Sequence, residues 1–351
     1  MGNGAPLKRE RPGGKTRPGS GPRATDAALG RLHRPRRIGP TPGPPLSPLY
    51  LLPHLPPDFA RAVPVILFLS DLHLGRGARQ ASRDAERSAC AVLAHHGPGL
   101  TRVFVVGDLF EQYMEYRHLA PKGFVRFQAA LAALTDRGVP VTYLLGNRDP
   151  WHLDYFREEL GVETVPDMWE GVLRVGPHGV RTYLAHGDGL DPAERAYRRL
   201  KPLMRHPRIA QLYRMGLPGD AAYALARRVG HAVSDGGPPQ AAPVAALRRA
   251  ADRLLGPAPG AGRADLVAFG HVHHADLGRH PGGAYLNPGY FFGDRTYGAL
   301  DAPHPTAPPR LRLFRWREDG PQTLATDAVP ADTGGTPRFP ARPPSSARPR
   351  P

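Results

Sequence analysis

The stretch LFLSDLHLG, residues 67–75, joins a short apolar run to an aspartate and a histidine two positions apart. Leu67, Phe68 and Leu69 suit a buried β-strand, and Asp71 and His73 follow at its end. An aspartate in this place often only forms a turn or caps a helix. Side chains at positions i and i+2 of an extended segment point to the same side, so the pair also suits a shared site.

Four later segments repeat this arrangement of an apolar strand followed by polar residues. The strands are RVFVV, VPVTYLL, VRTYLA and DLVAF, and the motifs after them are GDLFE, GNRD, HGD and GHVHH. Helix-like stretches at 83–96 and 122–137 separate the first three strands, which predicts strand–helix–strand crossovers onto a sheet core. Ligands bind at the carboxyl ends of such strands, so we expect the five strand ends to meet at one place.

The five strand ends together offer a set of side chains that commonly bind metals. These are Asp71, His73, Asp108, Asn147, His186, His271 and His273. Imidazole, carboxylate and amide oxygen without a thiolate suit Mn²⁺, Fe or Zn²⁺. Seven donors are too many for one ion, but they fit two ions that share a carboxylate and lie ~3.5–4 Å apart. The sequence therefore predicts a dinuclear metal site.

DLH, GDLFE, GNRD, HGD and GHVHH, in this order, resemble the five motifs of the calcineurin-like metallophosphoesterases. The resemblance covers about 65–290 and implies an α/β fold, a four-layer α/β/β/α sandwich with a dinuclear site. It assigns one ion to Asp71, His73, Asp108 and His273, and the other to Asp108 as the bridge with Asn147, His186 and His271.

One position departs from the pattern of many family members, which read GNHD where this chain has Arg148. An arginine is a poor general acid but a good planar clamp for phosphate oxygens. An alkoxide leaving group needs a proton, whereas a phosphate monoester leaves without one. Arg148 therefore favours cleavage of a pyrophosphate, and we predict catalytic roles for Arg148, Asp108 and Asn147, with Arg148 also binding substrate.

GNRD and GDLFE together are similar to the UDP-2,3-diacylglucosamine diphosphatases of lipid A synthesis, as are EYRHLAPKGFVR and YLAHGDGL. This resemblance implies hydrolysis of a UDP-linked acylated sugar to UMP and 2,3-diacylglucosamine 1-phosphate, with two divalent ions and Mn²⁺ preferred. It also implies a peripheral position on the inner leaflet of the cytoplasmic membrane. Nothing in the sequence indicates an obligate protein partner.

The segment of about 189–262 is predicted to be a helical cap inserted into this domain. It is much longer than a simple connection, and apolar residues recur in it at helical spacing among basic ones. The apolar set is Leu200, Leu203, Met204, Ile209, Leu212, Tyr213, Leu225 and Val229, and the basic set is Arg198, Arg199, Lys201, Arg205, Arg208 and Arg214. One interpretation is an apolar lining for acyl chains with a basic face toward anionic lipid. The alternative is an ordinary insertion whose stripe is core. PVAALRRAADRLL predicts one more helix.

Two further strands, AYLNPGYFF and RLRLFRWRE, are predicted in the second sheet. Asn287 and Tyr290 lie in or next to the first of them, from which they could reach the site. Loop asparagines are usually turn formers, so we assign neither residue a catalytic role.

The two ends of the chain differ from the middle. Residues 1–62 and 331–351 are rich in Pro, Gly and Arg, a composition typical of disordered segments, which leaves 63–330 as the metallophosphoesterase domain. These ends carry +8 and +3 of the net charge of +16, so the folded part is only mildly basic. No signal peptide or membrane-spanning run is visible, and Cys90 is the only cysteine, which predicts a cytoplasmic protein.

Two alternative functions remain open at this point. A nuclease or nucleotide phosphodiesterase would use the same metal chemistry, and basic ends could attract nucleic acid. Because that charge lies mostly in the ends, and the insertion is apolar where a nuclease needs a phosphate-tracking groove, nucleic acid is not the expected partner. A scaffold that has lost catalysis would carry degenerate ligands, but all seven positions are intact.

Overall fold

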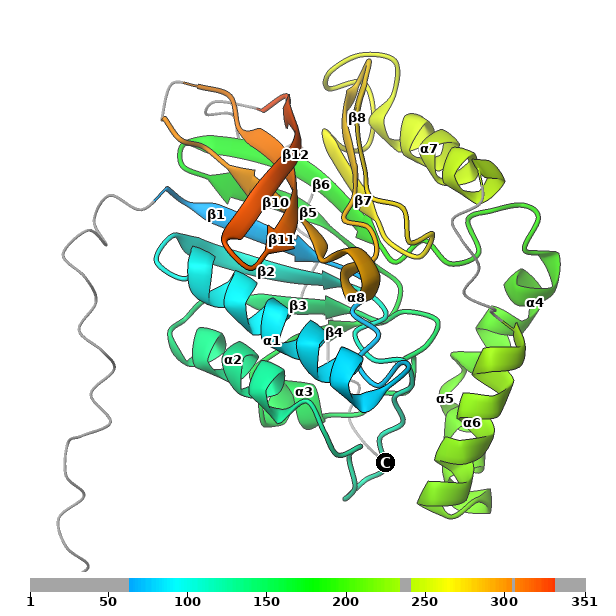
Figure 1. Cartoon of the computed structure of the whole chain (residues 1–351). Helices are drawn as coiled ribbons and strands as arrows, with labels where there is room; N and C mark the ends of the chain where they lie inside the picture. The colour runs from blue at the N-terminus through cyan, green and yellow to red at the C-terminus, as the bar shows by residue number, and fades with distance from the viewer. Residues whose placement is uncertain (1–62, 234–240, 305–306, 332–351) are drawn as a thin grey trace, which may run out of the picture. The chain divides into compact units, whose positions relative to one another are not determined.

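The computed structural model describes residues 63–233, 241–304 and 307–331 (Figure 1). The extensions predicted at 1–62 and 331–351 lie outside the described residues, except for Ala331. Within these ranges, seven strands form one sheet in the order β12-β11-β10-β1-β2-β3-β4, and five form another in the order β5-β6-β7-β9-β8. The strands are β1 (Val65–Leu69), β2 (Leu100–Val106), β3 (Val141–Leu144), β4 (Glu163–Val165), β5 (Met168–Val175), β6 (His178–Ala185), β7 (Leu266–Phe269), β8 (Asp276–His280), β9 (Gly283–Asn287), β10 (Thr296–Asp301), β11 (Arg310–Arg317) and β12 (Gly320–Ala328).

The helices flank the two sheets and fill one long connection. They are α1 (Arg79–His96), α2 (Val125–Asp136), α3 (Tyr155–Glu158), α4 (Arg195–Met204), α5 (Pro207–Gly216), α6 (Gly219–Val233), α7 (Ala241–Leu255) and α8 (Phe291–Asp294). β1, β2 and β3 pair in parallel, with α1 and α2 as the connections between them. The predicted crossovers are therefore present.

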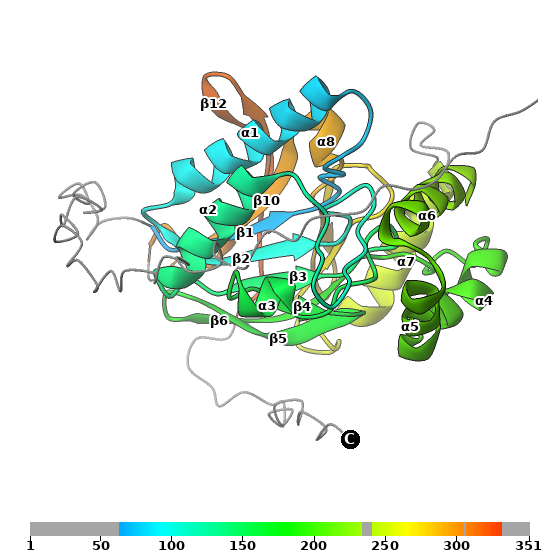
Figure 2. The ribbon, with the colours of Figure 1, turned by 90° about the horizontal axis from the view of Figure 1, so that it is seen from below.

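The first strand shows how the layers are held together. Ile66 and Phe68 belong to the apolar core shared by the two sheets, whereas Leu67 and Leu69 belong to the core between the first sheet and α1 and α2. Both faces of the strand are buried, which is why it reads as a continuous apolar run in the sequence. A third core joins the second sheet to α7. Figures 1 and 2 show the resulting order of helix, sheet, sheet and helix.

α1 is amphipathic because one of its faces is buried against the first sheet. The buried residues of α1 recur three or four positions apart and are Ser82, Ala85, Glu86, Ala89, Val92 and Leu93. This stripe packs on the first sheet while the other face of the helix meets solvent.

Two predictions about strand and helix placement need correction. RLRLFRWRE forms β11 in the seven-stranded sheet, not in the second sheet, where β9 does lie. β11 pairs with β10 along its length; burial of alternate residues predicts a strand but does not say which of two packed sheets it joins. The helix predicted from PVAALRRAADRLL is α7, which packs on the second sheet through Leu247 and Leu255. Within the predicted cap range of about 189–262, α7 is thus a layer of the sandwich.

The helices α4, α5 and α6 of that range carry many exposed apolar side chains. Those at least one-third exposed are Leu200, Leu203, Ile209, Leu212, Met215, Tyr223 and Leu225. Leu212 and Met215 are 64% and 76% exposed, so these apolar positions are not an ordinary core stripe. The side chain of Val229 lies outside the described residues.

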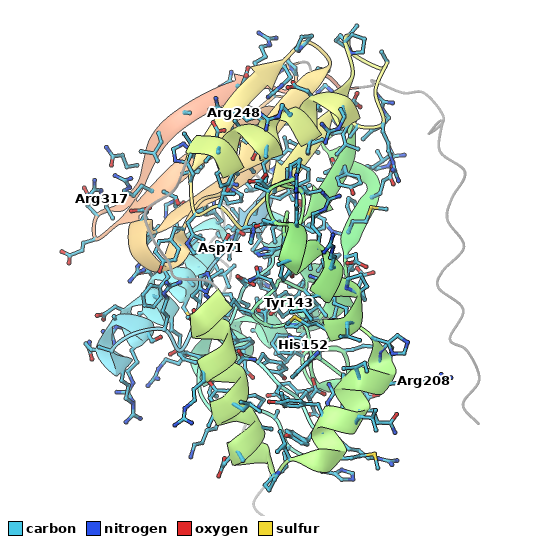
Figure 3. All side chains as sticks on the ribbon, turned by 90° about the vertical axis from the view of Figure 1, so that its right-hand side faces the viewer. Asp71, Tyr143, His152, Arg208, Arg248 and Arg317 are labelled. Carbon is cyan, nitrogen blue, oxygen red and sulfur yellow. The ribbon has the colours of Figure 1, made fainter. Side chains whose placement is uncertain are left out.

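His152 is half-buried beside Tyr143, whereas Arg208, Arg248 and Arg317 project from the surface (Figure 3). Its ring stacks on Tyr113 with centroids 4.0 Å apart, and both ring nitrogens are buried without a hydrogen-bond partner. Burial, together with the charge of Arg214, lowers the pKa of His152 to about 3. The folded protein therefore holds this ring neutral at pH values where an unfolded chain protonates it.

We expect this histidine to make the protein less stable in acid. Below pH ~6.5 the unfolded state binds a proton that the folded state does not, so the free energy of unfolding falls by about 1.4 kcal/mol per pH unit. His152→Phe keeps the ring and removes the titration. Urea unfolding of the metal-free wild type and variant should show the wild type losing about 2 kcal/mol more between pH 7.5 and 5.0. Equal losses of unfolding free energy in the two proteins would show that protonation of His152 does not destabilise the fold.

Candidate metal centre

The loops after five strands converge, and they come from both sheets. Asp71 and His73 follow β1, Asp108 follows β2, Asn147 and Arg148 follow β3, His186 follows β6, and His271 and His273 follow β7. β1 to β3 belong to the first sheet, and β6 and β7 belong to the second. The predicted meeting place thus lies where the ends of two packed sheets adjoin.

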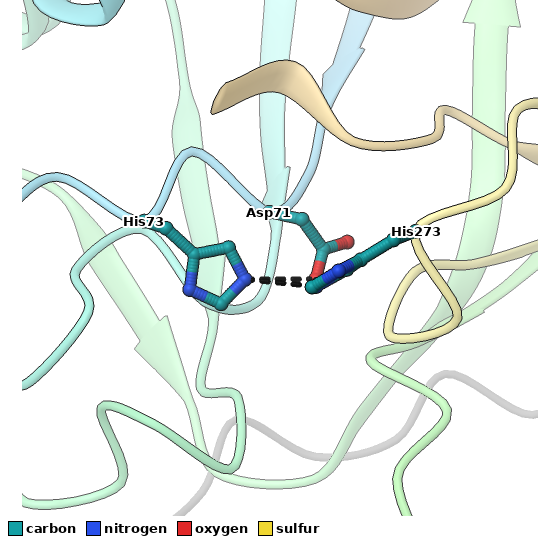
Figure 4. A group of neighbouring side chains, drawn as sticks. All are labelled: Asp71, His73 and His273. Carbon is teal, nitrogen blue, oxygen red and sulfur yellow. Dashed lines mark hydrogen bonds and ion pairs between the residues drawn. The ribbon is translucent and has the colours of Figure 1, made fainter. Parts of the chain in front are cut away.

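Asp71, His73 and His273 form the first cluster (Figure 4). One ligand atom from each lies within 4.8 Å of the others. The Nε2 atoms of His73 and His273 are 2.9 Å apart, and Oδ1 of Asp71 is 3.6 Å and 3.3 Å from them. This Oδ1 atom is buried and has no hydrogen-bond partner.

Asp108 lies between this cluster and a second one. Its Oδ2 atom is 3.7 Å from Nε2 of His73, and its Oδ1 atom is 3.5 Å from Nε2 of His186. Each carboxylate oxygen therefore faces a different histidine. Asp71, Asp108 and His186 also bring one ligand atom each within 4.8 Å of one another.

The side-chain oxygen of Asn147 lies between His186 and His271. Its Oδ1 atom lies 3.0 Å from Nε2 of His186 and 3.1 Å from Nδ1 of His271. All seven predicted ligands are thus brought together by the fold.

Hydrogen-bond acceptors contact the Nδ1 atoms of two histidines, on the side of each ring away from the metal site. Nδ1 of His73 bonds Glu111 at 2.8 Å, and Nδ1 of His186 bonds the carbonyl oxygen of Val106 at 2.9 Å. Such contacts leave Nε2 as the ligand nitrogen, an arrangement common around metals.

The backbone at the site is strained. Seven non-glycine residues in the described ranges have positive φ, and five of them are predicted ligands: Asp71, His73, Asp108, His271 and His273. Each such residue costs of order 1–3 kcal/mol and persists only where the surrounding structure enforces it. The strain is concentrated where the ligands are, which points to a functional site.

The glycines of two motifs are required by close approach. A Cβ atom at Gly146 would lie 2.0 Å from Oδ1 of Asp108, and one at Gly107 would lie 2.1 Å from Nδ1 of His186. Each glycine therefore leaves room for a ligand from another strand.

The site favours positive charge. Burial alone would lower the pKa of His73, but the Asp71 and Glu111 carboxylates raise it to about 9. Burial has the same effect on His186, and Asp108 raises its pKa to about 10. Metal ions bound by these residues would replace the protons and satisfy the same carboxylates. With the unpartnered oxygen of Asp71, this donor set fits two divalent ions.

Arg148 lies beside the ligands, with 6% of its surface exposed. Its backbone N–H donates to Oδ1 of Asp108 at 2.9 Å, and its guanidinium Nη1 lies 3.3 Å from Oε1 of Glu111. Glu111 therefore contacts both a predicted ligand, His73, and the predicted phosphate clamp.

Four residues of the site were not predicted. They are Glu111, Asp149, Glu194 and Tyr290, the last given no role from sequence. Asp149 accepts hydrogen bonds from the backbone of Phe110 and Gly146 and so shapes the GNRD loop. The ring of Tyr290 stacks on His273 with centroids 4.4 Å apart. Glu111 and Asp149 stand inside the quoted motifs, which was the one available signal.

The family model for "Calcineurin-like phosphoesterase" matches residues 64–275. The chain belongs to the calcineurin-like phosphoesterase family. The match covers the ends of β1, β2, β3, β6 and β7, and so every ligand-bearing loop of this phosphoesterase.

Among curated proteins, this phosphoesterase is similar to several named "UDP-2,3-diacylglucosamine hydrolase". It is 34% identical to the one from Porphyromonas gingivalis over 42% of the chain and 55% of that relative. It is 31% identical to the one from Nitrosococcus oceani over 46% of the chain and 61% of the relative. It is 29% identical to the one from Ralstonia nicotianae over 62% of the chain and 80% of the relative. The first two matches thus span little more than half of the relatives' lengths.

Proposed function

We propose that this protein is a dinuclear-metal hydrolase that cleaves the pyrophosphate of UDP-2,3-diacylglucosamine, releasing UMP and 2,3-diacylglucosamine 1-phosphate. One ion would be held by Asp71, His73, Asp108 and His273, and the other by Asp108, Asn147, His186 and His271. Mn²⁺ suits these nitrogen and oxygen donors. When bound, the ions supply a hydroxide nucleophile near neutral pH and neutralise charge on the phosphoryl oxygens.

The observation that carries the proposal is the position of Asp108. Its two carboxylate oxygens face His73 and His186 separately, at 3.7 Å and 3.5 Å. A carboxylate placed in this way suits a bridge between two ions, as in two-metal phosphoesterases.

Arg148 would orient the substrate. Its guanidinium has paired N–H donors that suit phosphate oxygens, and Glu111 pairs with the Nη1 atom of this group. Because the site around it is buried, hydrogen bonds to developing negative charge are worth more there than in water. Arg148 offers no proton to a leaving group, which suits a phosphate monoester as the group that departs.

The lipid part of the substrate would contact α4, α5 and α6. Their exposed apolar side chains, among them Leu212 and Met215, suit acyl chains or the surface of the inner leaflet, and exposed arginines such as Arg208 suit its anionic headgroups. None of the helices in the described ranges has the length and apolar character needed to cross a bilayer. We propose a peripheral association on the strength of these apolar and basic side chains. The relatives' name supports this substrate class.

The test is a comparison of two substrates with the purified full chain in Mn²⁺. We expect UMP release from UDP-2,3-diacylglucosamine with kcat/KM at least about tenfold above that for bis(p-nitrophenyl) phosphate. Faster cleavage of the diester without UMP release would favour the phosphodiesterase alternative.

The ends of the chain allow a further prediction. Removing 1–62 and 331–351 should leave turnover of a soluble diester and Mn²⁺ binding nearly unchanged, since all predicted ligands lie between Asp71 and His273. Loss of metal binding in the truncated protein would contradict the predicted domain boundaries. Calorimetric Mn²⁺ titration of both proteins makes the comparison.

A further inference from the structure

Glu194, the residue before α4, reaches the candidate metal centre from the long insertion. Its Oε1 atom lies 2.9 Å from Nε2 of His271. Its Oε2 atom accepts a 2.6 Å hydrogen bond from the backbone N–H of Gly189. One carboxylate therefore contacts a predicted ligand and the loop that follows another ligand, His186.

The orientation of the His271 ring gives this contact its meaning. Nδ1 of His271 lies 3.1 Å from Oδ1 of Asn147, so Nδ1 faces the place proposed for the second ion. Nε2 points away from that place and meets Glu194. An acceptor at the outer nitrogen fixes both the tautomer and the orientation of a ligating ring.

The origin of the acceptor distinguishes His271 from the other histidines. The acceptors for His73 and His186 are Glu111 and the Val106 carbonyl, which belong to β2 or the loop directly after it. The acceptor for His271 instead lies outside this region of β2, at the start of the insertion. We infer that Glu194 is a positioning residue for His271, through which the insertion completes the half of the centre that holds the second ion.

The insertion is anchored where this role requires it. Asp188, two positions after His186, contacts two residues of α4 and Arg205, which directly follows the helix. It accepts hydrogen bonds or ion pairs from Tyr197 at 2.5 Å, Lys201 at 2.9 Å and Arg205 at 3.2 Å. α4 is thus tied to the ligand-bearing loop along its length, which holds Glu194 in place.

The inference rests on the proposed dinuclear site and is tested by metal binding rather than turnover. The metal-free full chain is titrated with Mn²⁺ by calorimetry, and the pair of ions is observed by electron paramagnetic resonance. We expect Glu194→Ala to bind the first ion as the wild type does and the second about 10- to 100-fold more weakly. Glu194→Gln should lose less, because an amide oxygen can still accept from Nε2–H.

Glu158→Ala is the matched control. It removes an exposed carboxylate that pairs with Arg157 and contacts no predicted ligand, so both affinities should stay at the wild-type values. In a His271→Ala background, Glu194→Ala should add no further loss, since the two residues act through one interaction.

The outcomes separate this inference from the proposed function. A wild type that binds only one ion overturns both. If the wild type binds two ions and Glu194→Ala binds both equally well, only the role of Glu194 is wrong. Equal weakening of both ions in Glu194→Ala and Glu158→Ala would also overturn it, because the effect would then not be specific to the contact with His271. An increase in KM for the UDP-lipid with unchanged Mn²⁺ binding would assign Glu194 to the substrate instead.

Discussion

Asp108→Asn should reduce kcat/KM by roughly a thousandfold or more, equivalent to about 4 kcal/mol of transition-state stabilisation. The variant keeps one oxygen, which can still accept from the Arg148 backbone as Oδ1 does at 2.9 Å. It replaces the other oxygen with an amide group that cannot bind a cation, and it removes one negative charge. A bridge between two ions needs both oxygens.

The measurement is turnover of bis(p-nitrophenyl) phosphate together with metal content. Asp84→Asn is the control, because its carboxylate is exposed on α1 and pairs with Arg87, not with a predicted ligand. Circular dichroism should show that both variants fold. Near-wild-type turnover of Asp108→Asn with two ions bound would show that Asp108 is not the bridge.

Arg148→Ala should cost two to three orders of magnitude in turnover of the UDP-lipid. Loss of one preorganised electrostatic donor typically costs ~2.7–4 kcal/mol. Arg148→His restores the more common motif but should recover little of this activity, since imidazole lacks the paired donors of guanidinium. Turnover of a diester with a poor leaving group should instead rise, because histidine can donate a proton.

A charge-balanced variant keeps this test sharp. Arg148→Ala removes a positive charge that pairs with the Glu111 carboxylate, which is only 4% exposed. A buried carboxylate that loses such a partner destabilises the fold. Arg148→Ala combined with Glu111→Gln removes both charges and is compared with Glu111→Gln alone, because Glu111 also contacts His73. A further loss of activity in the double variant would reflect lost substrate contacts. If Arg148→Ala is harmless on the UDP-lipid and the wild type prefers plain diesters, the lipid A assignment is wrong.

The sequence by itself determined the sheet core with helical crossovers and the candidate donor set, because both depend on local patterns, whereas the sandwich was implied by the resemblance of the motifs to a family. Apolar runs such as 65–69 were long enough to predict strands, and the polar residues at their ends predicted the ligands from Asp71 to His273. Connections of helical character between β1, β2 and β3 then required a parallel sheet, whose strand ends share one edge. The family match over 64–275 spans the same motifs.

Only the tertiary structure decided which distant residues hold those ligands in place. Glu111 meets His73 across 38 positions and Glu194 meets His271 across 77, and no spacing rule links residues so far apart. The sheet joined by β11 and the layer joined by α7 were decided in the same way, by packing partners that alternating burial does not specify. The local sequence patterns indicated the predicted ligands. The orientation of these side chains depends on contacts that exist only once the two sheets and the insertion have packed.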